Sequence, residues 1–206
     1  MIISFIGSGQ VGRTLGDLFA KAGHKVILTN SRGKKSLERT VITLGENVFA
    51  GDQSDVRKSD LVVLATPFYA IEELDPSLLE GKIVVDATNY FPDRDGKNDQ
   101  LISRKTASSR FVSDHFKNAR VVKAFNILSV AGLSSLISFE DDSKRKVFPL
   151  AGDDVQAKKI VSDLIEQIGF AAYDVGSLDD SLLFQSDSPL FLFSGTLDEW
   201  KRRSAS

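Results

Sequence analysis

The sequence predicts an α/β fold, in which helices cover both faces of a doubly wound parallel sheet and a small C-terminal αβ extension follows. Two observations lead to this fold class. Short apolar segments alternate with amphipathic segments of helical period along the whole chain. Two of the apolar segments, Asp60–Ala65 and Lys82–Ala87, are continuous hydrophobic runs, which are typical of parallel strands covered by helices on both faces.

Residues 1–126 are predicted to form the core of this fold. Its first helix is expected because four apolar residues at helical spacing fall on one face. The expected strands are Met1–Ile6, Lys25–Thr29, Val48–Ala50, Asp60–Ala65, Lys82–Ala87 and Val121–Phe125. The expected helices are Gln10–Ala22, Lys34–Leu44 and Ser108–Phe116, with a polar loop at Phe91–Gln100.

Residues 127–206 are predicted to form the C-terminal extension. Its clearest element is a helix at Asp153–Ile168, where an apolar stripe follows two acids at the N-terminus and Gly169 comes just past the end. The other expected elements are a helical stretch at Val130–Ile137, a charged loop at Glu140–Lys146, strands at Val147–Ala151 and Ala171–Val175, and a terminal helix within Pro189–Arg203.

The composition of the 206 residues is ordinary for a globular protein, with 42% hydrophobic and 26% charged residues. The formal net charge of −2 gives no general attraction to nucleic acid or to anionic membranes. The chain has no cysteine, which excludes disulfides, thiolate metal sites and a cysteine nucleophile. No segment reaches the roughly 20 apolar residues of a membrane helix. We therefore expect a cytoplasmic protein without a nucleic-acid or membrane partner.

The sequence GSGQVG at residues 7–12 follows the first expected strand and opens the first expected helix. In this position a glycine motif is typical of a dinucleotide-binding Rossmann fold. Gly7 would permit the tight turn, Gly9 the approach of the backbone to a pyrophosphate, and Gly12 the close packing of helix and strand. The helix N-terminus supplies unpaired N–H donors for the anion. The alternative is a glycine-rich turn that binds nothing.

The cationic segment NSRGKK at residues 30–35 follows the second expected strand, where an acidic residue would hold a free ribose 2′-hydroxyl. Arg32 is expected to pair with a 2′-phosphate, and Ser31 to donate a hydrogen bond to it. Asn30 lies beside them, and Lys34 or Lys35 would add a point charge. This pattern favours NADP(H) over NAD(H). The alternative is a set of solvated cations at the start of a surface helix.

Two further strand ends carry polar residues that are expected at the same edge of the sheet, where ligands bind in open α/β folds. The segment ATPF at residues 65–68 is expected near the ribose or pyrophosphate, and the segment DATN at residues 86–89 near the nicotinamide. Asp86, which begins the second segment, is a candidate loop cap. For both segments a simple strand-ending turn is the alternative. The candidate contact residues are Ala65, Thr66, Pro67, Thr88 and Asn89.

The sixth expected strand ends in the sequence KAFN. A lysine inside an apolar strand is costly to bury without a partner, so we expect the end of Lys123 to reach a cleft or solvent. Asn126 is a candidate partner for the nicotinamide carboxamide or for a substrate, and Ala124 a candidate contact. The alternative is an edge lysine and a turn asparagine. Neither of the two histidines, His24 and His115, has catalytic or metal-ligand spacing.

These motifs together resemble the NADP oxidoreductases that depend on the deazaflavin coenzyme F-420. They are also similar to the cytoplasmic reductase domain of the six-transmembrane metalloreductases. The resemblance covers nearly the whole chain and implies a Rossmann domain with a small C-terminal extension that is often dimeric, so a homodimer is expected. The segments that carry it are GSGQVG, NSRG, DATN, VVKAFN, VFPLAGDDVQAKKIVSDLIEQIG and DVGSL.

The resemblance also implies roles for individual residues. In the deazaflavin reductases His stands where this chain has Asn126, whereas the metalloreductase version has Asn, so the acceptor need not be the deazaflavin. The sequence also has no membrane portion or haem ligand set. By the family pattern Ser8, Gln10 and Val11 line the pyrophosphate, Ser31 and Arg32 the 2′-phosphate, Thr66 and Pro67 the ribose region, and Ala124 to Asn126 the nicotinamide end.

These inferences predict an NADPH-dependent oxidoreductase that moves a hydride between the nicotinamide and a flavin- or deazaflavin-like acceptor. Such a transfer requires two rings held at stacking distance and excluded water, with no nucleophile. The candidates for the acceptor pocket are Asn89, Lys123 and Asn126. A non-catalytic NADP(H) sensor that signals through a partner is a second hypothesis. A third, an imine or ketone reductase, would use Lys123 or Tyr90 as the proton donor.

Overall fold

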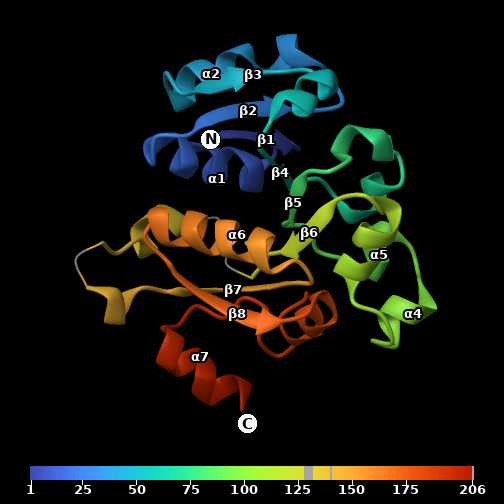
Figure 1. The fold of residues 1–206 in the computed structure, drawn as a ribbon, viewed down its shortest axis with the longest axis vertical. Helices are drawn as coiled ribbons and strands as arrows, with labels where there is room; N and C mark the ends of the chain where they lie inside the picture. The colour runs from blue at the N-terminus through green and yellow to red at the C-terminus, as the bar shows by residue number, and fades with distance from the viewer. Residues whose placement is uncertain (128–131, 140, 206) are drawn as a thin grey trace.

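The computed structural model describes residues 1–127, 132–139 and 141–205, and its centre is one eight-stranded sheet. The strands are β1 (Ile2–Ile6), β2 (Lys25–Thr29), β3 (Val48–Ala50), β4 (Leu61–Leu64), β5 (Ile83–Asp86), β6 (Arg120–Lys123), β7 (Val147–Gly152) and β8 (Ala171–Gly176). Their order in the sheet is β3-β2-β1-β4-β5-β6-β7-β8 (Figure 1). All neighbouring strands are parallel except β6 and β7, so the predicted α/β fold class is confirmed.

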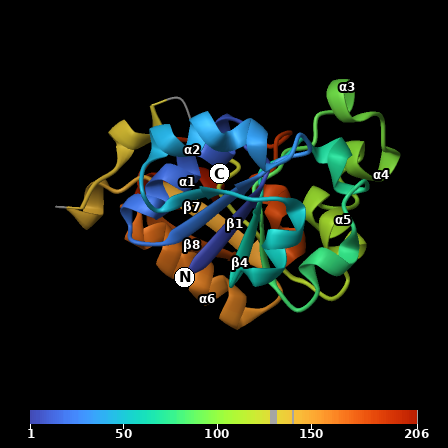
Figure 2. The same cartoon turned by 90° about the horizontal axis from the view of Figure 1, so that it is seen from above.

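Helices cover both faces of the sheet, and Figure 2 shows α1 and α5 on opposite sides of β1 and β4. Along β4 the side chains alternate between two buried clusters: Val63 packs with the α1 and α6 side, and Val62 with the α5 side. This alternation is why β4 is apolar throughout. The helices are α1 (Gln10–Lys21), α2 (Glu38–Leu44), α3 (Pro92–Asp95), α4 (Asp99–Ile102), α5 (Ser108–His115), α6 (Val155–Gln167) and α7 (Leu197–Ser204).

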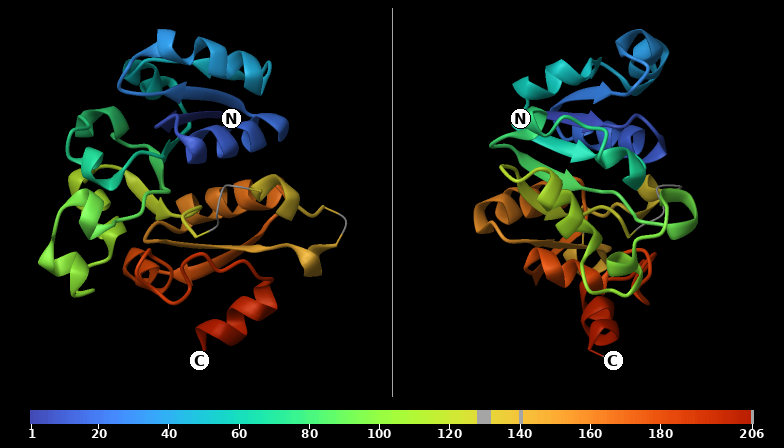
Figure 3. Two further views of the ribbon diagram at one scale, coloured as in Figure 1. Left: turned by 180° about the vertical axis from the view of Figure 1, so that it is seen from behind. Right: turned by 90° about the vertical axis from the view of Figure 1, so that its right-hand side faces the viewer.

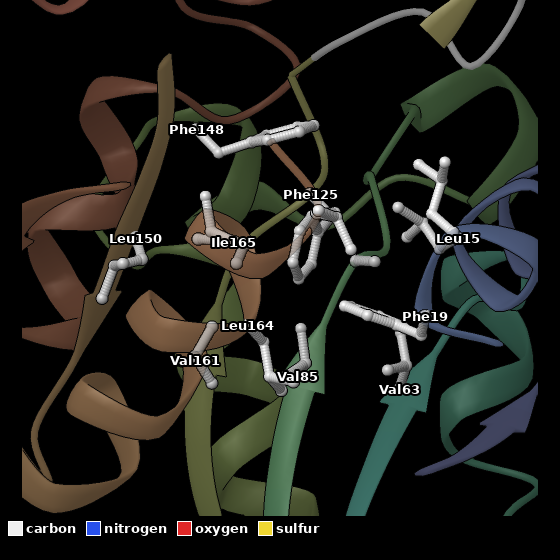
Figure 4. Packing of buried hydrophobic residues seen from close by; sticks show 14 of the residues in the cluster. Leu15, Phe19, Val63, Val85, Phe125, Phe148, Leu150, Val161, Leu164 and Ile165 are labelled. Carbon is white, nitrogen blue, oxygen red and sulfur yellow. The ribbon is translucent and has the colours of Figure 1, made fainter. Parts of the chain in front are cut away.

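Phe125, just beyond β6, joins the packing of α1 to that of β7. Its ring centroid lies 5.8 Å from that of Phe19 and 5.1 Å from that of Phe148 (Figure 4). Its backbone is left-handed, with φ of 63°, a conformation that is strained for a bulky residue. The packing of the ring therefore holds the backbone in a turn at the end of β6.

The C-terminal quarter of the chain extends the same sheet. β7 pairs antiparallel with β6 through Val122↔Gly152 and Lys123↔Ala151, and β8 then pairs parallel with β7. Helix α7 lies beyond β8 at the end of the molecule (Figure 3), where the buried ring of Trp200 contacts two phenylalanines. The predicted division of the chain at residue 126 stays a prediction.

Several predicted boundaries differ from the structure. The strand predicted to reach Phe125 ends at Lys123, because the chain turns there. The polar loop predicted at Phe91–Gln100 is wrong in part: α3 lies inside it, with Pro92 in its first turn, and α4 begins inside it, capped by the side chain of Asn98. The helix predicted at Lys34–Leu44 opens with a 3-10 turn at Lys34–Leu37.

Two predictions in the C-terminal part fall partly outside the described residues. These are residues 130 and 131 of the predicted helical stretch and Glu140 of the predicted charged loop. The described remainder of the first forms one 3-10 turn, Leu133–Leu136, and the second contains the turn Asp142–Lys144.

Candidate functional site

The glycine loop between β1 and α1 is pressed against the end of β4. Gly7 has φ of 114°, and a Cβ there would lie 2.2 Å from the carbonyl oxygen of Ala65. A Cβ at Gly12 would lie 2.1 Å from the carbonyl oxygen of Gly7. At Gly9, by contrast, a Cβ would meet no atom within 4 Å. Gly7 and Gly12 are therefore required by packing, whereas Gly9 keeps a space free beside the helix N-terminus.

That space adjoins the first turn of α1, whose N-cap is Gly9 and has no side-chain cap. The first intrahelical bond runs from the N–H of Arg13 to the carbonyl of Gly9, at 3.0 Å. The N–H groups of Gln10, Val11 and Gly12 precede this bond, so the helix geometry leaves them without intrahelical acceptors. A helix end of this kind binds anions through these donors and through the helix dipole.

A cavity of about 450 Å³ opens at the ends of β1, β2 and β4, a volume typical of ligand pockets. We call its lining the open half of the site. Nine residues predicted as cofactor contacts line it: Gly7, Ser8, Gly9, Asn30, Ser31, Arg32, Ala65, Thr66 and Pro67. The other predicted contacts do not line it: Gln10, Val11, Gly12, Lys34, Lys35, Thr88, Asn89, Ala124 and Asn126.

The side chain of Asn30 joins the glycine loop to the cationic segment. Its Nδ2 donates to the Oγ of Ser8 at 3.1 Å and to the Oγ of Ser36 at 3.0 Å. Its Oδ1 accepts from the backbone N–H of Arg32 at 2.9 Å. Ser31 and Arg32 are exposed, and no residue among those described pairs with the Arg32 guanidinium. The guanidinium is thus available to an anion at the cavity.

Several residues that line the cavity were not predicted from the sequence, and Arg13 and Tyr69 are the most informative of them. The Nε of Arg13 donates to the carbonyl of Ser8 at 2.8 Å, so this side chain reaches back over the glycine loop. Its position one turn after Gly9 is the signal that was available. Tyr69 follows the strand-ending segment at Thr66, and following that chain further would have found it. The remaining missed residues are Ile6, Gln53, Ala70, Glu73 and Leu74.

The ends of β5 and β6 form a second region, residues 86–89 and 123–126, which we call the closed half. The prediction that the end of Lys123 reaches a cleft or solvent is wrong, because its side chain is fully buried. Its partner is the equally buried carboxylate of Asp86, at 3.1 Å. Asp86 was predicted only as a loop cap, and this ion pair is a second role. Burial lowers the pKa of Lys123, and the charge and hydrogen bond of Asp86 oppose that shift.

Two asparagines close this region. The Nδ2 of Asn89 donates to the backbone carbonyl of Asn126 at 3.1 Å, and the Nδ2 of Asn126 donates to the Oδ1 of Asn89 at 3.3 Å and to the carbonyl of Phe184 at 3.0 Å. The Oδ1 of Asn126 is buried, and none of the described groups donates to it. A buried acceptor without a donor is rare in folded proteins, which makes this oxygen the polar group of the closed half that the described residues leave unsatisfied.

Asp95 connects the two halves. Its buried carboxylate accepts from the N–H of Tyr69, which lines the open half, at 3.3 Å and from the N–H of Phe91, two residues after Asn89 of the closed half, at 2.8 Å. Burial opposes its ionisation, but hydrogen bonds from Arg94 and from these two backbone groups outweigh burial. They hold the pKa of the Asp95 carboxyl below its ordinary value.

The remaining candidate acid–base groups are engaged elsewhere. The hydroxyl of Tyr90 donates to the carbonyl of Gly96 at 2.7 Å and accepts from the N–H of Asn98 at 2.9 Å. His24 contacts Gln167, and His115 contacts the carbonyl of Leu74. In the part of the chain that the structure describes, no three His, Cys, Asp or Glu side chains could hold a metal ion, and no helix is long and apolar enough to cross a membrane.

Comparison with known proteins points to one group. Residues 2–90 match the family model of coenzyme F420-dependent NADP oxidoreductases. The F420-dependent NADP reductase of Methanocaldococcus jannaschii is 29% identical, over 90% of this chain and 88% of that protein. The metalloreductase STEAP3 of Rattus norvegicus is 27% identical over 85% of this chain, which spans only 34% of the metalloreductase. The solved structure of a hypothetical protein, SMa0349 from Sinorhizobium meliloti, is 32% identical, with a TM-score of 0.82 and 95% coverage of both chains.

Proposed function

We propose that this chain, whose residues 2–90 match the family model of coenzyme F420-dependent NADP oxidoreductases, transfers a hydride between NADP(H) and a flavin- or deazaflavin-like acceptor. The observation that carries the proposal is the open half of the site. Gly9, the N-cap of α1, and Arg32, whose guanidinium has no partner among the described residues, line one cavity beside the N-terminus of α1, which together offer the donors that a pyrophosphate and a 2′-phosphate require.

The residues of the open half would bind the nucleotide as follows. The N–H groups at the start of α1 bind the pyrophosphate, and Arg13 holds the Ser8 carbonyl so that the glycine loop keeps its shape. Ser31 and Arg32, oriented by Asn30, bind the 2′-phosphate. A cation in place of an acidic residue at this strand end favours NADP(H) over NAD(H).

The closed half would hold the nicotinamide, which supplies or accepts the hydride when bound. The orphaned Oδ1 of Asn126 supports this role, because a carboxamide N–H that reached it would supply the missing donor. Asn89 then fixes the orientation of Asn126. Lys123 and Tyr90, the candidate proton donors of a ketone or imine reductase, are both engaged, which disfavours that alternative.

Titration of NADPH fluorescence with micromolar protein tests the proposal, with NADH as the control for the 2′-phosphate. We expect saturable binding that is at least about tenfold tighter for NADPH, which corresponds to about 1.4 kcal/mol. Oxidation of NADPH with a panel of FMN, FAD, a deazaflavin and ferric chelates then identifies the acceptor. Absence of NADPH binding would exclude the proposed function, whereas binding without turnover of any acceptor would support an NADP(H) sensor.

A further inference from the structure

The buried ion pair between Asp86 and Lys123 is not explained by stability. The two residues are register partners on β5 and β6, and neither side chain is exposed. Removing both charges from water costs free energy, and the attraction between the two charges does not reliably offset that cost. Two apolar residues of similar size would therefore stabilise the contact between β5 and β6 equally well. Charges at these positions therefore call for another role.

Most of the bonds that the pair makes beyond itself converge on one residue, Thr88. The Oδ1 of Asp86 accepts from the backbone N–H of Thr88 at 2.9 Å and from its Oγ1 at 2.6 Å. The Nζ of Lys123 donates to the backbone carbonyl of Thr88 at 2.5 Å. The Oδ2 of Asp86 also accepts from the Oγ of Ser109 on α5, at 2.6 Å. An apolar pair could make none of these bonds.

These bonds fix the backbone that leads into Asn89 and the backbone that leads into Asn126. Because the N–H and the carbonyl of Thr88 are both held, the backbone that leads into Asn89 has one orientation. On β6, Lys123 anchors the start of the turn that passes through the left-handed Phe125 to Asn126. The two asparagines then bond to each other.

We propose that Asp86 and Lys123 are positioning residues, which hold Asn89 and Asn126 in the geometry required at the nicotinamide end of the site. The inference rests on the proposed function. Neither residue touches the cofactor or moves a proton, since both side chains are fully enclosed. Their effect is on the placement of the ring, where small displacements reduce the rate of hydride transfer strongly.

The test compares Asp86→Asn, Lys123→Met and the double variant with the wild-type protein. Each single variant leaves an unpaired buried partner and is expected to lower the melting temperature by several degrees. The double variant removes both charges and should recover most of the lost melting temperature. Its kcat is nevertheless expected to stay at least about tenfold below wild type, with the Kd for NADPH within about threefold, because the open half is untouched. Recovery of kcat together with the melting temperature would overturn the proposal.

Arg110→Met is the matched control. It breaks the ion pairs that α5 makes with Asp153 and Asp179, away from the closed half, and should leave kcat unchanged. If the charge variants do not fold, Ser109→Ala removes one bond to Asp86 without changing any charge. It is expected to lower kcat about threefold or more with an unchanged Kd, and an unchanged kcat would count against the proposal.

A readout independent of turnover separates this inference from the proposed function. Amide hydrogen exchange at residues 86–90 and 123–127 is expected to be faster in the double variant than in wild type and unchanged in Arg110→Met. Equal exchange in wild type and the double variant would overturn the positioning role. Failure of the wild-type protein to bind NADPH would instead overturn the proposed function, whatever the exchange rates.

Discussion

The open half of the site lies at the ends of β1, β2 and β4 around a cavity, whereas the polar side chains of the closed half, at the ends of β5 and β6, are bonded to one another and are buried except for the half-buried Asn89. In the open half the donors are backbone N–H groups and an exposed guanidinium, which have no acceptors among the described residues. In the closed half the polar groups satisfy one another, with the Oδ1 of Asn126 left over. The contrast supports the proposal that the open half binds the cofactor and the closed half orients it.

The largest expected effect tests the packing of the open half. In Gly12→Ala the new Cβ would clash with the carbonyl of Gly7, which is backbone and cannot turn away. We expect a loss of about 3 kcal/mol or more in the free energy of unfolding, measured by urea denaturation. Gly9→Ala is the control: its stability should match wild type, while NADPH affinity falls at least about tenfold because the methyl fills the space left for the pyrophosphate. Unchanged affinity in Gly9→Ala would remove the cofactor from that space.

The next effect concerns selectivity within the open half. Arg32→Ala is expected to weaken NADPH binding by about 2 kcal/mol, the usual value of a charge-assisted hydrogen bond, and to leave NADH binding unchanged. Arg13→Met should weaken both cofactors alike, since Arg13 supports the glycine loop. Fluorescence titration measures both constants. Equal losses for NADPH and NADH in Arg32→Ala would show that its guanidinium does not contact the 2′-phosphate.

A smaller effect is expected in the closed half. Asn126→Ala removes the amide that bonds to Asn89 and to the Phe184 carbonyl. We expect kcat to fall about tenfold, or about 1.4 kcal/mol in activation free energy, while the Kd for NADPH changes little. Steady-state kinetics with the best acceptor measures the split. A rise in Kd without a change in kcat would reverse the roles assigned to the two halves.

The smallest effect tests Asp95, which links the halves. Its folded-state pKa is below the ordinary value of 3.8, so its contribution to stability is complete above that value and is lost as the pH falls through the folded-state pKa. Asp95→Asn should lower the free energy of unfolding at pH 7 by on the order of 1 kcal/mol. The difference from wild type should shrink below about pH 4. A difference that stays constant down to pH 3 in urea unfolding would contradict this assignment.

The same contrast explains what the sequence could predict. The open half is encoded in short segments at strand ends, such as GSGQVG and NSRG, so spacing along the chain was sufficient to find nine of its lining residues. The closed half depends on the register of β5 against β6, which pairs Asp86 with Lys123. Because β5 is buried on both faces, it has no alternation of buried and exposed residues from which the register could be predicted. The antiparallel pairing of β7 with β6 was also not predicted, because the sequence of a buried apolar strand does not indicate the direction in which the strand runs.

The hydrogen bond from Asn126 to Phe184 affects the order in which the two halves of the site can form during synthesis of the chain. Asn30 and Ser8, which shape the open half, are 22 residues apart, whereas Asn126 and Phe184 are 58 residues apart. A ribosome therefore releases every lining residue of the open half, the last of which is Leu74, long before Phe184 emerges. Contacts between distant residues form late, so the open half can take its shape before the bond between Asn126 and Phe184 completes the closed half.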